Sequence, residues 1–208
     1  MPKIVTSLNK LRYSGRMCPE SWELLLTGLS KVRSDDDPLD ALQCLSICGP
    51  SDTLWQMPTH PEHSQSYRHL AAALARLVVH LADESSAAQI LKSLDQHLAG
   101  EMDLGDALLS VPAHLRTLVD YDHHSWEFAE VGEAATGAVL MAFYRDPCLS
   151  PFLVAEAAAH ALGGPETAQA RISEVIRDFL SADDPHMPHG PHPANLLSHR
   201  PEVTTCHE

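Results

Sequence analysis

The stretch LAAALARLVVHLA, residues 70–82, decides the fold class of this chain. Arranged as a helix it is apolar around most of its circumference, which is the pattern of a central helix packed against neighbours on several sides. The residues from Thr59 to Pro61 supply a helix start just before it. The sequence therefore predicts a helix from about Pro61 to about Ala82 at the centre of the core.

Proline and glycine divide the rest of the chain into segments of helical length, with proline near each start and glycine near each end. Pro19 begins the first segment, and Pro38 begins a second that Gly49-Pro50 ends. The stretch SDTLWQMPTH that follows, residues 51–60, is predicted to be an irregular loop. The longest later helix is expected from Asp122 to Arg145. Other helix starts are predicted at Ser86, Asp103, Pro112, Ser150-Pro151 and Pro165.

These segments together predict an all-α fold. No segment alternates apolar and polar residues for long enough to make a strand, and only 5% of the residues are aromatic, so a sheet has little support. We expect eight or nine helices in a multi-helix bundle or a helical-hairpin array. Residues 1–182 are predicted to form a single helical domain. Residues 183–208, with five prolines and five histidines, are predicted to form an irregular tail.

The charge balance limits the partners. The chain has 208 residues with 14 Lys and Arg against 28 Asp and Glu, a formal charge of −14, which repels nucleic-acid backbones and anionic lipids. We expect neither nucleic acid nor a membrane as partner, but a protein or a small molecule. No signal peptide or membrane-spanning run is evident. The five cysteines are irregularly spaced without a CxxC pair, so a reducing compartment, the cytoplasm, is expected.

A metal site is one candidate for the function of the segment DYDHHSWEFAEVGE, residues 120–133. His123, Glu127 and Glu130 fall at i, i+4 and i+7, so they share one stripe of a predicted helix. Glu156 and His160, at i and i+4 of another helix, could complete the ligand set, as in bundle metal proteins. A divalent transition metal is the cofactor that such ligands would take. The favoured interpretation of the first stripe, which has Glu133 close beside it, is the solvated face of an amphipathic helix.

The tail offers a second group of metal ligands. His186, His189 and His192 recur at spacing three between prolines, so an extended segment could present their imidazoles to zinc, nickel or copper. No second-shell partners that would fix the rings are evident in the tail. The favoured interpretation is weak, adventitious metal binding.

A metal-free enzyme is a further possibility for the same segment. His124 would then act as a general base, with the carboxylate of Asp120 orienting its ring. The chain contains no Gly-x-Ser-x-Gly elbow, no Walker loop and no dinucleotide-binding glycine pattern. The usual hydrolase and nucleotide-binding classes therefore lose support.

Some conspicuous side chains are predicted to serve packing. Cys44 and Cys48 lie among leucine and isoleucine in one predicted helix, where free cysteines are usually inert fillers. Trp55 lies in the predicted loop beside Leu54 and Met57, and it either fills the core or faces a partner. Filling the core is favoured because exposed apolar clusters are uncommon on soluble monomers.

The stretch AEAAAHALGGPETAQARISEVI, residues 155–176, and the earlier LAGEMDLGDALLSVPAHL, residues 98–115, resemble a bacterial family of small helical immunity proteins. The resemblance spans about Pro38 to Leu180 and carries no motif whose residues transfer. It implies a cytosolic protein that binds or neutralises a partner, a role that suits an acidic helical surface. The competing class is a small helical enzyme of a small-molecule pathway that uses a His/carboxylate site, with or without a metal.

Overall fold

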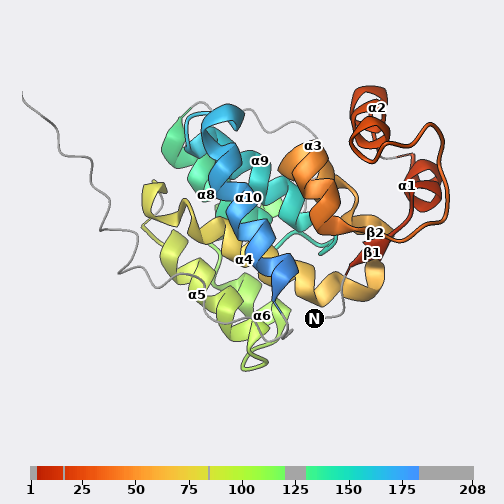
Figure 1. Cartoon of the computed structure of the whole chain (residues 1–208). Helices are drawn as coiled ribbons and strands as arrows, with labels where there is room; N and C mark the ends of the chain where they lie inside the picture. The colour runs from red at the N-terminus through yellow and green to blue at the C-terminus, as the bar shows by residue number, and fades with distance from the viewer. Residues whose placement is uncertain (1–3, 16, 84, 120–129, 183–208) are drawn as a thin grey trace, which may run out of the picture.

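A computed structural model of the chain describes residues 4–15, 17–83, 85–119 and 130–182. In these ranges the protein is all-α, as predicted, and contains ten α-helices (Figure 1). The helices are α1 (Leu8–Ser14), α2 (Pro19–Gly28), α3 (Ala41–Trp55), α4 (Ser64–Arg76), α5 (Ala87–Leu98), α6 (Leu104–Leu109), α7 (Ala113–Val119), α8 (Val131–Met141), α9 (Ser150–Ala161) and α10 (Pro165–Ser181). Short 3-10 turns are η1 (Met57–Thr59), η2 (Pro61–His63) and η3 (Val79–Leu81).

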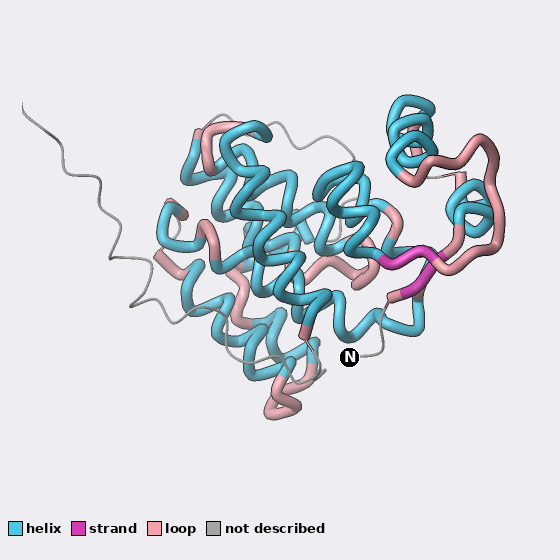
Figure 2. The backbone as a smooth tube through the Cα atoms, viewed as in Figure 1, coloured by secondary structure: helices cyan, strands magenta, loops and turns pink. Residues whose placement is uncertain are grey.

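The described residues contain one short ladder, in which β1 (Val5–Thr6) pairs antiparallel with β2 (Leu39–Asp40). Figure 2 shows this ladder at the base of the N-terminal segment, against the otherwise helical body. Two residues per strand are too few for a sequence pattern of period two, so the ladder was not predicted. It joins two connecting segments rather than forming a layer of the fold.

Helix α4 is the central helix, and its predicted place in the core is confirmed. Leu70, Ala71 and Leu74 are fully buried, and the helix packs against α5, α8, α9 and α10. Its predicted end was wrong, because the α-helix stops at Arg76 and the chain continues as the 3-10 turn η3. The backbone leaves the helix at Val78, with φ −126° and ψ −8°. Two adjacent β-branched residues follow Leu77, and such side chains lose χ1 freedom in an α-helix.

The helical backbone of α3 is interrupted at Gly49-Pro50, where the helix was predicted to end, but the chain resumes at once as a second helical segment that continues to Trp55. Gly49 adopts φ +83° and ψ −175°, and Pro50 lacks an amide proton, so the hydrogen-bond ladder is interrupted and restarts at proline. The stretch predicted as a loop is therefore helical in its first half. Trp55 is half-buried, and its ring centroid lies 4.7 Å from that of Phe152 in α9.

Helices α8 and α9 pack against each other, and most of their buried residues are alanine, glycine, serine or threonine. The small side chains let the two axes approach closely. Arg68 of α4 donates hydrogen bonds to the carbonyl oxygens of Ala142 and Tyr144, at 2.9 and 3.0 Å. These bonds satisfy carbonyls just beyond the end of α8, which stops at Met141 rather than at the predicted Arg145. The helix also begins later than predicted, at Val131 rather than at Asp122, because the backbone of Glu130 is extended, with φ −137° and ψ 159°.

The core of the described residues consists of two apolar clusters. The larger one surrounds α4, α8 and α9. The smaller one contains Leu8, Leu11, Leu25, Leu39 and Cys44, and it lies under α1, α2 and the first half of α3. Figure 1 shows α1 and α2 at one side of the molecule, apart from the other helices. None of the described helices is both long and apolar enough to cross a membrane.

Candidate functional site

The structure describes three of the seven residues predicted for a metal or catalytic site. Glu130 directly precedes α8, whereas Glu156 and His160 lie one turn apart on α9, and all three side chains are exposed. Within the part of the chain that is described, no three His, Cys, Asp or Glu side chains are gathered as metal ligands. The other four lie outside the described residues: Asp120, His123, His124 and Glu127. The complete metal set and the His124–Asp120 pair therefore stay predictions.

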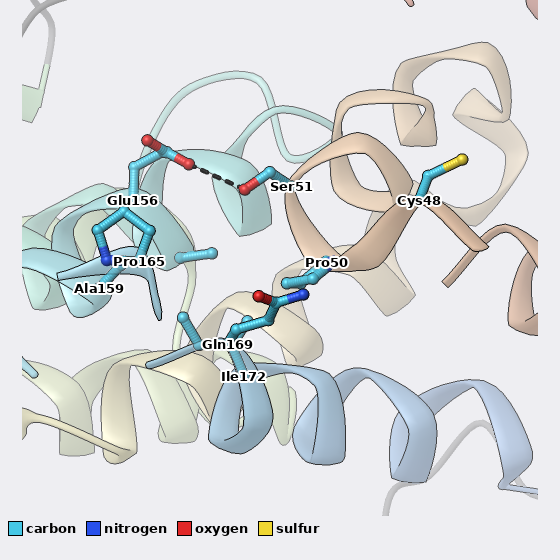
Figure 3. A pocket seen from close by; sticks show the side chains of 9 residues that line it. Cys48, Pro50, Ser51, Glu156, Ala159, Pro165, Gln169 and Ile172 are labelled. Carbon is cyan, nitrogen blue, oxygen red and sulfur yellow. Dashed lines mark hydrogen bonds between the residues drawn. The ribbon is translucent and has the colours of Figure 1, made fainter. Parts of the chain in front are cut away.

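A groove of about 220 Å³ lies where α3, α9 and α10 meet, and we take it as the candidate functional site (Figure 3). Helix α3 contributes its kink, α9 contributes the buried Ala155 and Ala159 with the exposed Glu156, and α10 contributes its first two turns. The lining residues are Cys48, Pro50 and Ser51 of α3, Ala155, Glu156 and Ala159 of α9, and Pro165, Gln169 and Ile172 of α10.

The kink in α3 is the local cause of the groove. At Gly49 the backbone has a positive φ, which glycine adopts without the steric cost that a Cβ brings. A Cβ on Gly49 would lie only 3.3 Å from the side-chain nitrogen of Gln169 in α10. On the opposite wall, Ala155 and Ala159 fill little space. A glycine at the bend and alanines across from it together leave the hollow open.

The rim of the groove is polar and carries one carboxylate. Ser51 Oγ donates a hydrogen bond to Glu156 Oε1 at 3.2 Å, which joins α3 to α9 (Figure 3). Glu156 is exposed, so its carboxylate keeps free acceptor positions toward solvent. Figure 3 shows the amide of Gln169 below this pair, on the α10 side. The groove therefore suits a guest that donates hydrogen bonds, above all a cationic one.

Cys48, at one side of the groove, is not an activated nucleophile (Figure 3). Burial raises the pKa of its thiol to about 11, and the carboxylate of Asp52 adds to this effect. Cys44, one turn earlier, is fully buried, and burial raises its pKa to about 12. Both thiols are protonated at neutral pH, and a protonated thiol is a poor nucleophile. This agrees with their predicted role as packing residues.

Sequence reasoning missed most of this site. Ser51 and Glu156 are 105 residues apart, and no periodic pattern relates them. The available signal was the Gly49-Pro50 dipeptide, which reads equally well as a helix end or as a kink. Glu156 was chosen as a metal ligand, but its partner in the structure is a serine hydroxyl.

Comparisons of the chain with protein-family models, with curated proteins and with solved structures give no match. Fold and site thus define a class of molecule only, an all-α protein with an acid-rimmed groove. The resemblance to helical immunity proteins stays an expectation. The groove and the charge of the chain are the features from which we infer a function.

Proposed function

We propose that this chain is a cytosolic interaction protein that binds a basic protein partner and accepts a lysine or arginine side chain of that partner in the groove. The observation that carries the proposal is the Ser51–Glu156 rim above a lining of alanine, proline and isoleucine. A carboxylate beside an apolar wall suits both the charged end and the aliphatic stem of such a side chain.

The size of the groove favours a side chain over a free small molecule. Pockets that enclose small-molecule ligands usually have about 300–1,000 Å³, and this groove has about 220 Å³. It is an open hollow at the surface, between three helices. One side chain presented by a larger partner fits this space, and the partner supplies the remaining contact area.

The formal charge of −14 supports a basic partner. A strongly acidic surface accelerates the encounter with a basic protein and suppresses binding of acidic ones. The resemblance to immunity proteins implies the same kind of role. The enzyme alternative requires acid and base groups that converge in a cavity, and the lining of this groove contains no histidine.

A titration with Nα-acetyl-arginine amide, followed by the backbone ¹⁵N shifts of Ala155 and Ala159, tests the proposal. We expect saturable shifts confined to the groove. Glu156→Gln should weaken binding by up to about fivefold, because an exposed ion pair contributes up to about 1 kcal/mol. Glu174→Gln on the exposed face of α10 makes the same charge change outside the groove and should leave binding unchanged.

A third variant separates shape from charge. Ala159→Leu fills the groove but leaves the net charge at −14, so it should abolish the shifts while circular dichroism confirms that the helices remain. Equal weakening by Glu156→Gln and Glu174→Gln would show that diffuse charge alone attracts the cation. That result, or binding unaffected by Ala159→Leu, would refute a specific site in the groove.

A further inference from the structure

His60 lies at the junction between the N-terminal helix α1 and the body of the protein. It separates η1 from η2, and its side chain is 5% exposed. Its Nδ1 lies 3.2 Å from Nζ of Lys10, a residue of α1 that precedes it by 50 positions. The same nitrogen lies 3.2 Å from Oε1 of Glu62. One ring atom therefore contacts both an ammonium group and a carboxylate.

These two partners make opposite demands on Nδ1. The ammonium of Lys10 can only donate, so it needs a bare Nδ1 with the ring proton on Nε2. The carboxylate of Glu62 can only accept, so it needs a proton on Nδ1. A neutral ring with its proton on Nε2 satisfies Lys10, whereas a neutral ring with its proton on Nδ1 satisfies Glu62. An imidazolium ring satisfies Glu62 and places a second positive charge beside Lys10.

Burial decides which state exists at neutral pH. The Nε2 atom is buried and has no hydrogen-bond partner among the described residues, so a charge on this ring is poorly solvated. Burial lowers the pKa of His60, and Lys10 and His63 lower it further, while the hydrogen bond with Glu62 opposes them. The ring is therefore neutral at pH 7, and we place its proton on Nε2, so that Nδ1 accepts the hydrogen bond from Lys10.

The other titratable groups near the ring do not replace either partner. The ring of His63 lies 6.3 Å from that of His60, and its other face contacts Tyr67 of α4, with centroids 6.1 Å apart. The guanidinium of Arg68, next on α4, is bonded to carbonyl oxygens at the end of α8. Lys10 from α1, with Glu62 and His63 from η2, are the charged or titratable groups that act on the ring.

We propose that His60 is an acid-sensitive latch between α1 and the body: protonation of its ring by solvent transfers the Nδ1 hydrogen bond from Lys10 to Glu62 and loosens α1 from η1 and η2, while Leu8 and Leu11 keep the helix in the smaller apolar cluster. Helix α2 stays in place, because Ser21 Oγ of α2 donates to Asp52 Oδ2 of α3 at 2.6 Å. The latch acts on one helix and leaves the groove at α9 and α10 intact.

The sign of the pH dependence follows from the lowered pKa of His60. The latched state binds fewer protons than the loosened state, in which the ring returns toward the usual pKa of about 6.5. The contribution of the latch to stability is therefore fully present above about pH 6.5. It is lost as the pH falls through the pKa of the latched ring.

Two measurements on the unaltered protein test the latch. Two-dimensional ¹H–¹⁵N spectra of the histidine rings give the tautomer and the titration midpoint of His60, and backbone amide shifts of Leu11 and Arg12 report on α1. We expect a neutral ring protonated on Nε2 at pH 7.5, a midpoint below 6.5, and the same midpoint in the α1 amides. A midpoint at or above 6.5, or α1 amides that do not follow it, would overturn the proposal.

Matched variants give an independent check. Lys10→Met removes the competing ammonium, so the midpoint of His60 should rise, and the α1 amides should stop responding to pH. Lys31→Met removes a lysine that pairs with Asp35 and Asp37 instead and should leave the midpoint unchanged. If Lys31→Met moves the midpoint as far as Lys10→Met does, general charge rather than the Lys10 contact controls the ring, and the latch is refuted.

Discussion

Replacing Arg68 with methionine removes a buried guanidinium that joins the central helix α4 to the end of α8. Arg68 is only 4% exposed, and its two terminal nitrogens donate to the carbonyl oxygens of Ala142 and Tyr144. Both of these residues are buried as well. Methionine keeps most of the aliphatic volume, so the change tests the hydrogen bonds more than the packing.

The size of the effect follows from these two bonds. A hydrogen bond to a charged group contributes about 1.5–3 kcal/mol, so the pair contributes about 3–6 kcal/mol. Burying the guanidinium costs part of that gain. We therefore expect Arg68→Met to lower the free energy of unfolding by about 3 kcal/mol, with a loss of about 6–12 °C in Tm for a domain of this size. The free energy of unfolding of Arg68→Lys should lie between those of the unaltered protein and of Arg68→Met, because an ammonium lacks the planar fork that reaches both carbonyls.

Urea unfolding followed by circular dichroism at 222 nm measures this loss. Arg76→Met is the matched control on the same helix, since Arg76 is 40% exposed and pairs with Asp95 at the surface. The control should cost less than about 1 kcal/mol. If Arg68→Met costs less than about 1 kcal/mol with an unchanged m-value, the carbonyls find other donors, and the proposed role of Arg68 in holding α4 against α8 is wrong.

Three other outcomes are expected. Gly49→Ala should lower the free energy of unfolding in urea by about 1–3 kcal/mol, because its backbone conformation is one that only glycine adopts readily. Gly100→Ala is the control, since the space around its Cβ position is open, and it should cost about 1 kcal/mol. Equal losses in the two variants would contradict the role of the kink. Iodoacetamide at pH 7.5 should modify the exposed Cys18 more than tenfold faster than Cys48, as peptide mass spectrometry would show, unless Cys48 carries an unexpected thiolate. Metal bound by the full chain should be lost in a version that ends at Ala182, because this version lacks His186, His189 and His192; stoichiometric metal retained in plasma mass spectrometry would instead support the embedded site.

Local signals in the sequence predicted the helices well, since each depends on residues within a few positions. Proline at the first turn marks the starts of α2, α9 and α10, and its fixed φ and missing amide proton suit that position. The apolar run 70–82 identified the central helix because burial on all sides needs apolar residues on all sides. Its end was misplaced, since the pattern stays apolar through η3.

Gly49-Pro50 shows where local reasoning fails. The dipeptide interrupts the hydrogen-bond ladder in either case, whether the helix ends or resumes after a bend. It resumes here because Thr53 and Leu54 become buried, and that burial depends on helices that come much later in the chain. No window of sequence around the dipeptide contains this information.

The sequence alone determined that this chain forms helices, which of them is central, and that the chain carries a formal charge of −14. Only the tertiary structure showed that the groove exists, that Arg68 bonds the carbonyl oxygens beyond the end of α8, and which groups contact His60. The reason is distance along the chain: the hydrogen bonds at these three places join residues 105, 74 and 50 positions apart. Such pairs leave no periodic trace, because each forms only after the helices between its members have packed.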